Sequence, residues 1–299
     1  MNLAPITIFV YNRLKNTKAT IEALQRNPLS KSSILYIYSD GPKNESDQVK
    51  VSEVRNYIKK TTGFKTINIY NRNENYGLKR NIIEGVSHVI SMHGKVIVLE
   101  DDLVTSPYFL DFMNQGLIYY NKNERIQSIS GYTMPLKVLE NTNKDFYLGL
   151  RASSWGWATW DHVWNGIDWE VKDFDSFYSN AKLRNSFNAG GSDMSSMLKN
   201  NMSKKISSWA IVFCYDQWKK NRLTVFPTKS KIINFGFAKE ASNTKHIIPE
   251  YQTNLDNSNK KKFQFDDNLI VDPQITKSFA YNFSYYVRIK NKLLNIFRN

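Results

Sequence analysis

The first hundred residues alternate between short apolar runs and segments with helical spacing. Apolar runs predict strands at Ile6–Val10, Ser33–Ser39, Ile67–Tyr70 and Val96–Leu99. The segments between them predict helices at Lys15–Arg26, 45–61 and Gly77–Ser91. Strands that alternate with helices form a parallel sheet through right-handed crossovers. We therefore expect an α/β fold whose ligand crevice lies above the carboxyl ends of its strands.

Three consecutive acids, Glu100, Asp101 and Asp102, follow the last of these strands. Like charges at one strand end raise each other's pKa values, unless a hard divalent cation that takes oxygen ligands offsets the repulsion. A solvated acidic turn is the alternative interpretation. The sequence thus predicts a cation site at this edge of the sheet.

Other polar residues should reach the same edge, because they follow the first two strands. These residues are Asn12, Arg13 and Asp40. The first strand is followed by no Gly-rich phosphate fingerprint, which disfavours a dinucleotide-binding or P-loop protein. We expect a phosphate bound here to be held by a metal ion and side chains.

Composition narrows the class of protein. A chain of 299 residues can bury a large core, as one elaborated domain or as a domain with a small appendage. A net charge of +14 favours a polyanionic partner: nucleic acid, an anionic membrane surface or a phosphate-bearing substrate. The single Cys214 fits a reducing compartment. With no signal-peptide pattern and no apolar run of about 20 residues, we expect a cytoplasmic protein.

The order of several short motifs resembles a known family. These motifs are VYNR, YSDGP, NYGLKRNI, VLEDDL, SGY, SSWGWATWDHVW and FPTKSKIINFGF. Together they resemble nucleotide-sugar-dependent glycosyltransferases of the GT-A fold, over residues 4–246. Bacterial polysaccharide glycosyltransferases similar to the animal N-acetylglucosaminyltransferases of glycoprotein synthesis are the nearest group.

The resemblance implies a fold and a division of the chain. The fold is a mixed, mainly parallel sheet flanked by helices, which forms a catalytic domain over residues 1–250. Residues 1–103 would form its nucleotide-binding half and residues 104–250 its acceptor-binding half.

The resemblance also implies roles for the predicted site. Asp102 would hold Mn²⁺ or Mg²⁺ between the two phosphates of the donor, with Glu100 and Asp101 facing the ribose or sugar. Asp40 resembles the acid that accepts a hydrogen bond from uracil.

Basic residues resemble the base and phosphate contacts of the family: Arg13, and Lys79 or Arg80. Because Lys79 and Arg80 lie on the first turns of a predicted helix, the alternative interpretation is that they form a solvated basic face of that helix.

The segment from Ser153 to Trp164 contains four tryptophans, whose spacing does not make one helical stripe. We expect Trp160 and Trp164, four residues apart on a predicted helix, to pack in the core. By resemblance, Trp155 and Gly156 lie beside the donor sugar and acceptor, and glycine permits a close backbone approach.

Two acids compete for the role of catalytic base, which an inverting transfer needs for the acceptor hydroxyl proton. Asp193 lies in a Gly-rich turn at a predicted helix start, where an ordinary N-cap is the alternative. Asp216 resembles the base of the animal enzymes' WDDW element, but it falls within a predicted helix from Ser208 to Asn221. The place expected from the family spacing holds Ser208 and Trp209, which cannot act as a base. We favour Asp193, and a retaining mechanism stays open.

A later segment, Ile232–His246, resembles the mobile loop that closes over the donor. The family's glycines are replaced here by residues 238–243. His246 is a candidate ligand of the metal or pyrophosphate, with a plain surface histidine as the alternative.

Residues 251–299 change character. A polar, lysine-rich connection around residues 252–267 precedes apolar residues at helical spacing from Ile275, interleaved with lysine and arginine. This pattern predicts a basic amphipathic helix that lies on an anionic membrane or packs on the catalytic domain.

The sequence therefore leads to one hypothesis with alternatives. We expect a metal-dependent hexosyl- or N-acetylhexosaminyltransferase that moves a sugar, from a UDP-sugar by default, to a growing bacterial surface glycan on a lipid carrier. It would work in the cytoplasm or on the inner face of the plasma membrane, with no nucleic-acid partner. The alternatives are a non-catalytic carbohydrate- or nucleic-acid-binding module and a sugar-phosphate nucleotidyltransferase.

Overall fold

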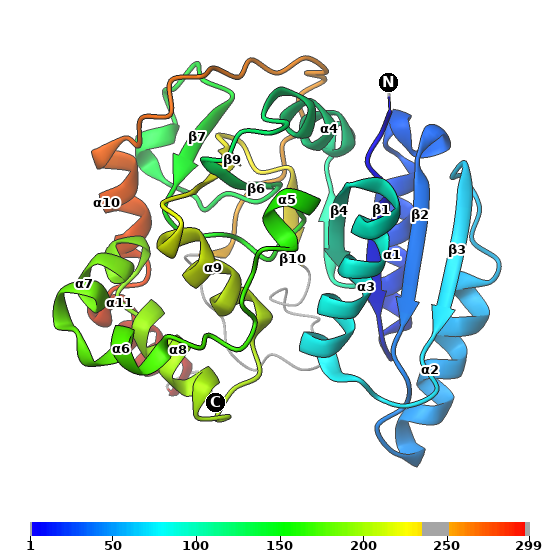
Figure 1. Cartoon of the computed structure of the whole chain (residues 1–299). Helices are drawn as coiled ribbons and strands as arrows, with labels where there is room; N and C mark the ends of the chain where they lie inside the picture. Colours follow the sequence, from blue (N-terminus) through cyan, green and yellow to red (C-terminus); the bar gives the residue numbers. More distant parts are fainter. Residues whose placement is uncertain (1, 235–250, 297–299) are drawn as a thin grey trace.

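The computed structural model describes residues 2–234 and 251–296, and it has a central eight-stranded mixed sheet with helices on both faces (Figure 1). The strand order is β3-β2-β1-β4-β8-β6-β9-β7. A second sheet pairs β5 (Leu103–Thr105) with β10 (Ile232–Asn234) in antiparallel register. The expected α/β fold with a mainly parallel sheet is confirmed.

The amino-terminal half contains the four parallel strands that the sequence predicts. They are β1 (Ile6–Val10), β2 (Ile34–Ser39), β3 (Thr66–Asn71) and β4 (Lys95–Glu100). The helices between them are α1 (Leu14–Gln25), α2 (Glu45–Ile58) and α3 (Gly77–His93). Every residue of β1 is buried, which explains its unbroken apolar run.

The sheet changes its direction of growth between β1 and β4. The chain runs from β1 outward to β2 and β3, and then returns to the other side of β1 as β4, with Phe9 opposite Glu100. Accordingly, α3 covers one face while α1 and α2 pack together on the other (Figure 1). Open α/β sheets bind ligands at such a switch point, outside the carboxyl ends of the strands.

The second half extends the same sheet. In it, β8 (Trp157–Trp160) runs antiparallel to both β4 and β6 (Ile126–Ser130). Next, β9 (Leu223–Pro227) is parallel to β6, and β7 (Phe146–Gly149) forms the antiparallel edge. One sheet thus joins both predicted halves.

Helices and short turns complete this half. They are α4 (Phe109–Tyr119), η2 (Lys137–Leu139), α5 (Asp161–Trp164), α6 (Phe174–Ser179), α7 (Ala181–Phe187), η3 (Asn188–Gly190), α8 (Met194–Met202) and α9 (Trp209–Lys219), with η1 (Pro28–Ser32) in the first half. Helix α9 confirms the helix expected over Ser208–Asn221, and Ser208 caps it by accepting a bond from the Ile211 backbone N–H.

Tryptophans form much of the core between the sheet and α9. Trp157, Trp160 and Trp164 are all buried, and the Trp157 ring stacks on Trp164 and on Trp209 at 5.6 and 4.8 Å between centroids. The core role expected for Trp160 and Trp164 is confirmed, but the prediction that both lie on one helix is wrong. Trp160 ends β8, and α5 begins only at Asp161, because the buried residues 157–160 pair with β4 as a strand.

The carboxyl-terminal segment forms two helices, where the sequence suggested one. Helix α10 (Pro273–Tyr281) starts at Pro273, and Asp272 caps it. Helix α11 (Tyr285–Ile296) follows after a break at Asn282–Ser284, where the Phe283 carbonyl accepts a hydrogen bond from the Ser192 hydroxyl. Among the described residues, none of the helices has the length and apolar character needed to span a membrane.

The connection before α10 lies against the domain. Asp256 forms a buried ion pair with Lys231, and the buried Phe263 ring meets Phe112 edge-on at 5.1 Å. The polar connection is therefore anchored to the second half of the sheet.

Candidate active site

Arg13 joins the carboxyl ends of β1 and β4. Its guanidinium donates one hydrogen bond to Asp101 and another to Oδ2 of Asp102, at 3.1 Å. The Thr20 hydroxyl on α1 holds the Asp101 backbone carbonyl at 2.9 Å. The acids and Arg13, which the sequence placed at one edge, therefore meet at the topological switch point.

The acid cluster is electrostatically strained. Burial and the neighbouring Asp102 and Asp101 raise the pKa of Glu100 to about 8. Burial also raises the pKa of Asp101 to about 6, against the opposing effect of Arg13. Burial lowers the pKa of Arg13, but the two carboxylates raise it more, so the guanidinium stays charged. One arginine thus partly neutralises three acids.

The donor set fits a Mg²⁺ or Mn²⁺ ion that is shared with a substrate. Within residues 2–234 and 251–296, no three His, Cys, Asp or Glu side chains form a cluster that could hold a metal ion by themselves. However, Mg²⁺ is commonly held by one or two carboxylates plus substrate phosphates. Oδ2 of Asp101 is buried and has no hydrogen-bond partner in the described part of the chain. Asp101 and Asp102 therefore suit an ion completed by phosphate oxygens.

Asp40 organises the turn that leads into α3. Its buried carboxylate accepts hydrogen bonds from the backbone N–H groups of Tyr76 and Gly77, at 2.8 and 3.0 Å, and from the Asn75 side chain at 3.2 Å. Tyr76 itself provides no side-chain cap for the helix. Asp40 thus fixes the amino terminus of α3, and its role toward a nucleotide base stays a prediction.

Asn12 does not contact the acid cluster directly. Its amide donates to Asp47 at 2.8 Å, and the Tyr11 hydroxyl donates to the other oxygen of Asp47 at 2.7 Å. These bonds lower the pKa of Asp47, in the first turn of α2. Burial and the bond to Asp47 raise the pKa of Tyr11 to about 12. Asp47 joins Tyr11 and Asn12, after β1, to the first turn of α2, and the sequence analysis missed this contact.

Lys79 and Arg80 lie at the beginning of α3, with Gly77 and Tyr76, around a shallow hollow that Ser207 borders from the other half. The Arg80 guanidinium is half exposed, pairs with Glu84 at 2.7 Å and lies 3.7 Å above the Tyr76 ring. Their predicted phosphate role is compatible with this position at a helix amino terminus.

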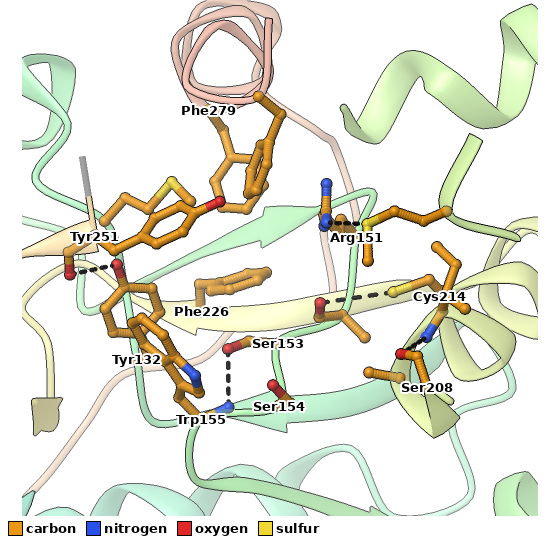
Figure 2. Close-up of a pocket in the computed structure, with 16 residues that line it drawn as sticks. Tyr132, Arg151, Ser153, Ser154, Trp155, Ser208, Cys214, Phe226, Tyr251 and Phe279 are labelled. Atoms are coloured by element: carbon orange, nitrogen blue, oxygen red, sulfur yellow. Dashed lines mark hydrogen bonds between the residues drawn. The ribbon is translucent and has the colours of Figure 1, made fainter. Parts of the chain in front are cut away.

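A cavity of about 260 Å³ lies in the second half (Figure 2). Trp155 and Tyr132 form one wall, with their rings edge to face at 4.5 Å, and Tyr251 meets Trp155 at 5.8 Å. Phe279 lies on the opposite side (Figure 2), and Phe283 also lines the cavity. Polar groups come from Arg151, Ser153, Ser154 and Ser208. The cavity is a mainly apolar pocket with several aromatic rings and a few polar side chains, called here the aromatic pocket, and this composition is typical of small-ligand sites.

Gly156, next to the pocket-lining Trp155, packs against β10. It adopts a left-handed conformation with φ of +59°, and a Cβ there would lie 2.7 Å from Cδ1 of Ile232. Ile232 pairs in turn with Thr105, three residues after Asp102. Gly156 therefore contacts the strand that pairs with β5, the segment directly after the acids.

Asp193 forms a buried ion pair with Arg151. The two guanidinium nitrogens donate to the two carboxylate oxygens at 2.7 and 3.0 Å, and Phe283 stacks on the guanidinium at 3.8 Å. Burial lowers the pKa of Arg151, but Asp193 raises it more. Asp193 occupies the N-cap position of α8, as the alternative interpretation expects, but its side chain makes no capping hydrogen bond. Asp193 thus lies behind a pocket-lining arginine.

Asp216 lies elsewhere on α9. Its carboxylate pairs with Lys220 at 2.6 Å and Arg222 at 3.6 Å, and accepts a bond from the buried Gln127 at 3.2 Å. The residues of α9 that line the pocket are Ala210, Ile211 and Cys214. The structure therefore brings Asp193, and not Asp216, next to the pocket. His246 falls outside the described residues.

Arg151 is the main site residue that the sequence analysis missed. Arg151 lies in the loop between β7 and β8, and its partner Asp193 is 42 residues away in the chain. One signal was available: residues 190 and 191 are both glycine, and a Cβ at Gly191 would lie 2.6 Å from the Arg151 guanidinium. Only a residue without a side chain leaves room for the ion pair.

No protein-family model matches the sequence, and no curated protein matches it. Several solved structures share a distant similarity with the chain, including a mannosyltransferase and TarS. A mannosyltransferase from Pyrobaculum calidifontis, solved with GDP-mannose and Mn²⁺, is 11% identical with a TM-score of 0.40. This alignment covers 56% of the present chain and 50% of the other. TarS of S. aureus is 11% identical with a TM-score of 0.39, over 76% of the present chain and 36% of TarS.

The chain thus spans half or less of the length of these two proteins. At this level of similarity they assign neither a family nor an activity to this chain.

Proposed function

We propose that this protein is a glycosyltransferase that uses a nucleotide sugar and a divalent cation. The arrangement of Arg13, Asp101 and Asp102 at the switch point between β1 and β4 is the observation that carries the proposal. Carboxylates there suit a cation that binds phosphate, and the motif order of the chain resembles the GT-A glycosyltransferases. A pocket for a second substrate lies nearby, which a two-substrate transfer requires.

The donor half would hold the nucleoside diphosphate. Asp102, with Asp101, would hold Mn²⁺ or Mg²⁺, and the bound ion would neutralise the charge on the leaving diphosphate. Arg13 supplies a fixed positive charge beside the two acids. Lys79 and Arg80, in the first turn of α3, would add positive charge for phosphate, while Asp40 already binds the N–H groups of Tyr76 and Gly77 at this helix end. A UDP-sugar is the donor we propose, with Asp40, Asn12 and Glu100 near its nucleoside and sugar.

The aromatic pocket would hold the acceptor. Trp155 and Tyr132 offer ring faces for a sugar, and Arg151 and three serines offer polar contacts. We propose as acceptor a growing bacterial surface glycan on a lipid carrier. The proposed compartment is the cytoplasm, which suits a chain whose single cysteine, Cys214, is free and buried.

The proposed transfer proceeds by inversion. The acceptor hydroxyl oxygen attacks the anomeric carbon, the carbon–oxygen bond to the nucleoside diphosphate breaks, and a carboxylate takes the hydroxyl proton. We propose Asp193 as this carboxylate because its partner Arg151 lines the pocket. Arg151 holds both of its oxygens, so Asp193 can accept the proton only when one of these two bonds opens.

The test is thermal stabilisation of the full chain by UDP-, GDP-, CMP- and dTDP-sugars, with and without Mn²⁺. We expect one nucleotide class to raise the melting temperature only with the cation, because a ligand stabilises the state it binds. Asp102→Asn should lose the shift. Glu53→Gln, which changes an exposed acid on α2, is the matched control and should keep it.

Two results would overturn the proposal. Stabilisation that persists without the cation and in Asp102→Asn would indicate a binding module that does not use the acid cluster. If no nucleotide sugar raises the melting temperature, the proposed donor is wrong.

A further inference from the structure

The described part of α11 has two opposite faces, and the apolar one points away from the protein. Val287 and Asn291 are buried against the domain. Tyr285, Tyr286, Ile289 and Leu293, called here the apolar stripe, are between 41% and 70% exposed. At about 100° per residue, the stripe covers an arc of about 100° on the side opposite to the two buried residues. Packing on the domain therefore leaves this stripe uncovered.

Exposed apolar side chains concentrate in this region. Six of the sixteen exposed large hydrophobic side chains among the described residues fall within residues 281–294. Scattered single residues need no explanation, but a contiguous stripe usually marks an interaction site.

Positive charge borders the apolar stripe on both sides. By the same helical geometry, Lys290 lies along one edge of the stripe, and Lys292 and Arg288 lie along the other. No acidic residue occurs from Pro273 to the end of the chain, while Lys277 adds a further cation on α10. Arg288 also reaches the Ser192 hydroxyl at 3.4 Å, which ties α11 to the domain.

We propose that α11 docks on the surface of an anionic lipid bilayer. Helices that lie in the membrane interface combine an apolar stripe with lysine and arginine at its edges, and tyrosine suits the boundary between acyl chains and water. Basic residues near the surface are attracted by anionic headgroups. A second copy of the chain is a poorer occupant because a symmetric contact would bring the two sets of cations together.

This docking would place the aromatic pocket close to the bilayer. Phe283 lines the pocket, and the stripe begins only two residues later, at Tyr285. The pocket would then receive an acceptor carried by a lipid, an extension that rests on the proposed glycosyl transfer. The docking itself depends only on the geometry and charge of α11.

Co-sedimentation of the full chain with lipid vesicles tests the proposal. We expect binding to vesicles of equal parts phosphatidylcholine and phosphatidylglycerol, little binding to phosphatidylcholine alone, and weaker binding as salt is added. The triple variant Tyr285→Ser, Ile289→Ser, Leu293→Ser should bind at least about tenfold more weakly. The matched control, Val49→Ser, Met92→Ser, Ile118→Ser, removes exposed apolar side chains elsewhere and should bind as the parent does.

Other outcomes would overturn the docking. These are equal binding by the triple variant and the parent, equal binding to both kinds of vesicle, or a lipid-free dimer in sedimentation velocity that the triple variant abolishes. Melting temperatures of all variants report whether each is folded. Nucleotide-sugar binding is measured separately without lipid, so its failure and the failure of vesicle binding are distinguishable.

Discussion

Nη1 of Arg13 lies 3.1 Å from Oδ2 of Asp102, across the boundary between β1 and β4. This contact joins the segments after two strands that are neighbours in the sheet but 85 residues or more apart in the chain. It shows that the acid cluster already has a protein cation, and that this cation and a metal ion would act on the same two carboxylates.

Replacing Arg13 should destabilise the metal-free protein. We expect Arg13→Gln to lower the free energy of unfolding by about 2 kcal/mol, because it leaves Asp101 and Asp102 without their charged donor. Urea unfolding in a chelator measures this loss, and Mn²⁺ should recover part of it. Arg80→Gln removes a well-exposed ion pair and should leave the urea midpoint unchanged. An Arg13 variant as stable as the parent would contradict the account.

The acid cluster should make the metal-free protein less stable as the pH rises from 6 to 8. The pKa of Glu100 is raised from 4.5 to about 8, so in this range the folded protein keeps a proton that the unfolded chain has released. The free energy of unfolding then falls with pH, by at most about 1.4 kcal/mol per pH unit for one group.

Urea unfolding at pH 6, 7 and 8 in a chelator measures this slope. Glu100→Gln cannot ionise at this position and should flatten it, whereas Glu53→Gln should keep it. A slope that is the same in Glu100→Gln as in the parent would show that another group is responsible.

The buried pair of Arg151 and Asp193 should be strongly coupled. Both side chains are 12% exposed, so Arg151→Met leaves an unpaired buried carboxylate and should cost about 3 to 5 kcal/mol. Asp193→Leu should cost a similar amount, and the double variant should recover much of the loss. A double-mutant cycle by urea unfolding gives the coupling energy. Additive losses would mean that the two side chains act independently.

Two glycines with similar backbone angles should respond differently to alanine. Gly77→Ala meets no atom within 4 Å, so it should cost only the left-handed backbone term, about 1 kcal/mol. Gly156→Ala also crowds Ile232, and should cost about 2 kcal/mol more. Thermal or urea unfolding compares them. In a protein that already carries Ile232→Ala, the two glycine variants should have the same further cost. Equal costs in the parent protein would contradict the close packing beside Trp155.

The parts of the site that follow strands could be predicted, because strand ends converge by topology. Arg13 and the acids are of this kind: buried apolar runs identify β1 and β4, and parallel pairing puts their ends together. Arg151 could not be found in this way, since its position depends on how the loops around residues 151 and 191 pack.

The local sequence pattern also led to wrong predictions for two elements, because tertiary contacts determine their structure. The spacing of Trp160 and Trp164 predicts that both lie on one helix, but residues 157–160 pair with β4 as a strand. The carboxyl-terminal helix breaks near Phe283 because that ring and Phe279 both pack over the pocket, while Ser192 binds the Phe283 carbonyl. Neither partner is visible in the local sequence.

Release of nucleoside diphosphate from a nucleotide sugar is the most direct test of the central claim. The full chain is incubated with Mn²⁺ and each nucleotide sugar, with water or added glycan as acceptor, and the diphosphate is measured over time. We predict release from one donor class, and a rate about a hundredfold lower in Asp102→Asn, with Glu53→Gln equal to the parent. No release from any donor, or an equal rate in Asp102→Asn, would contradict the account.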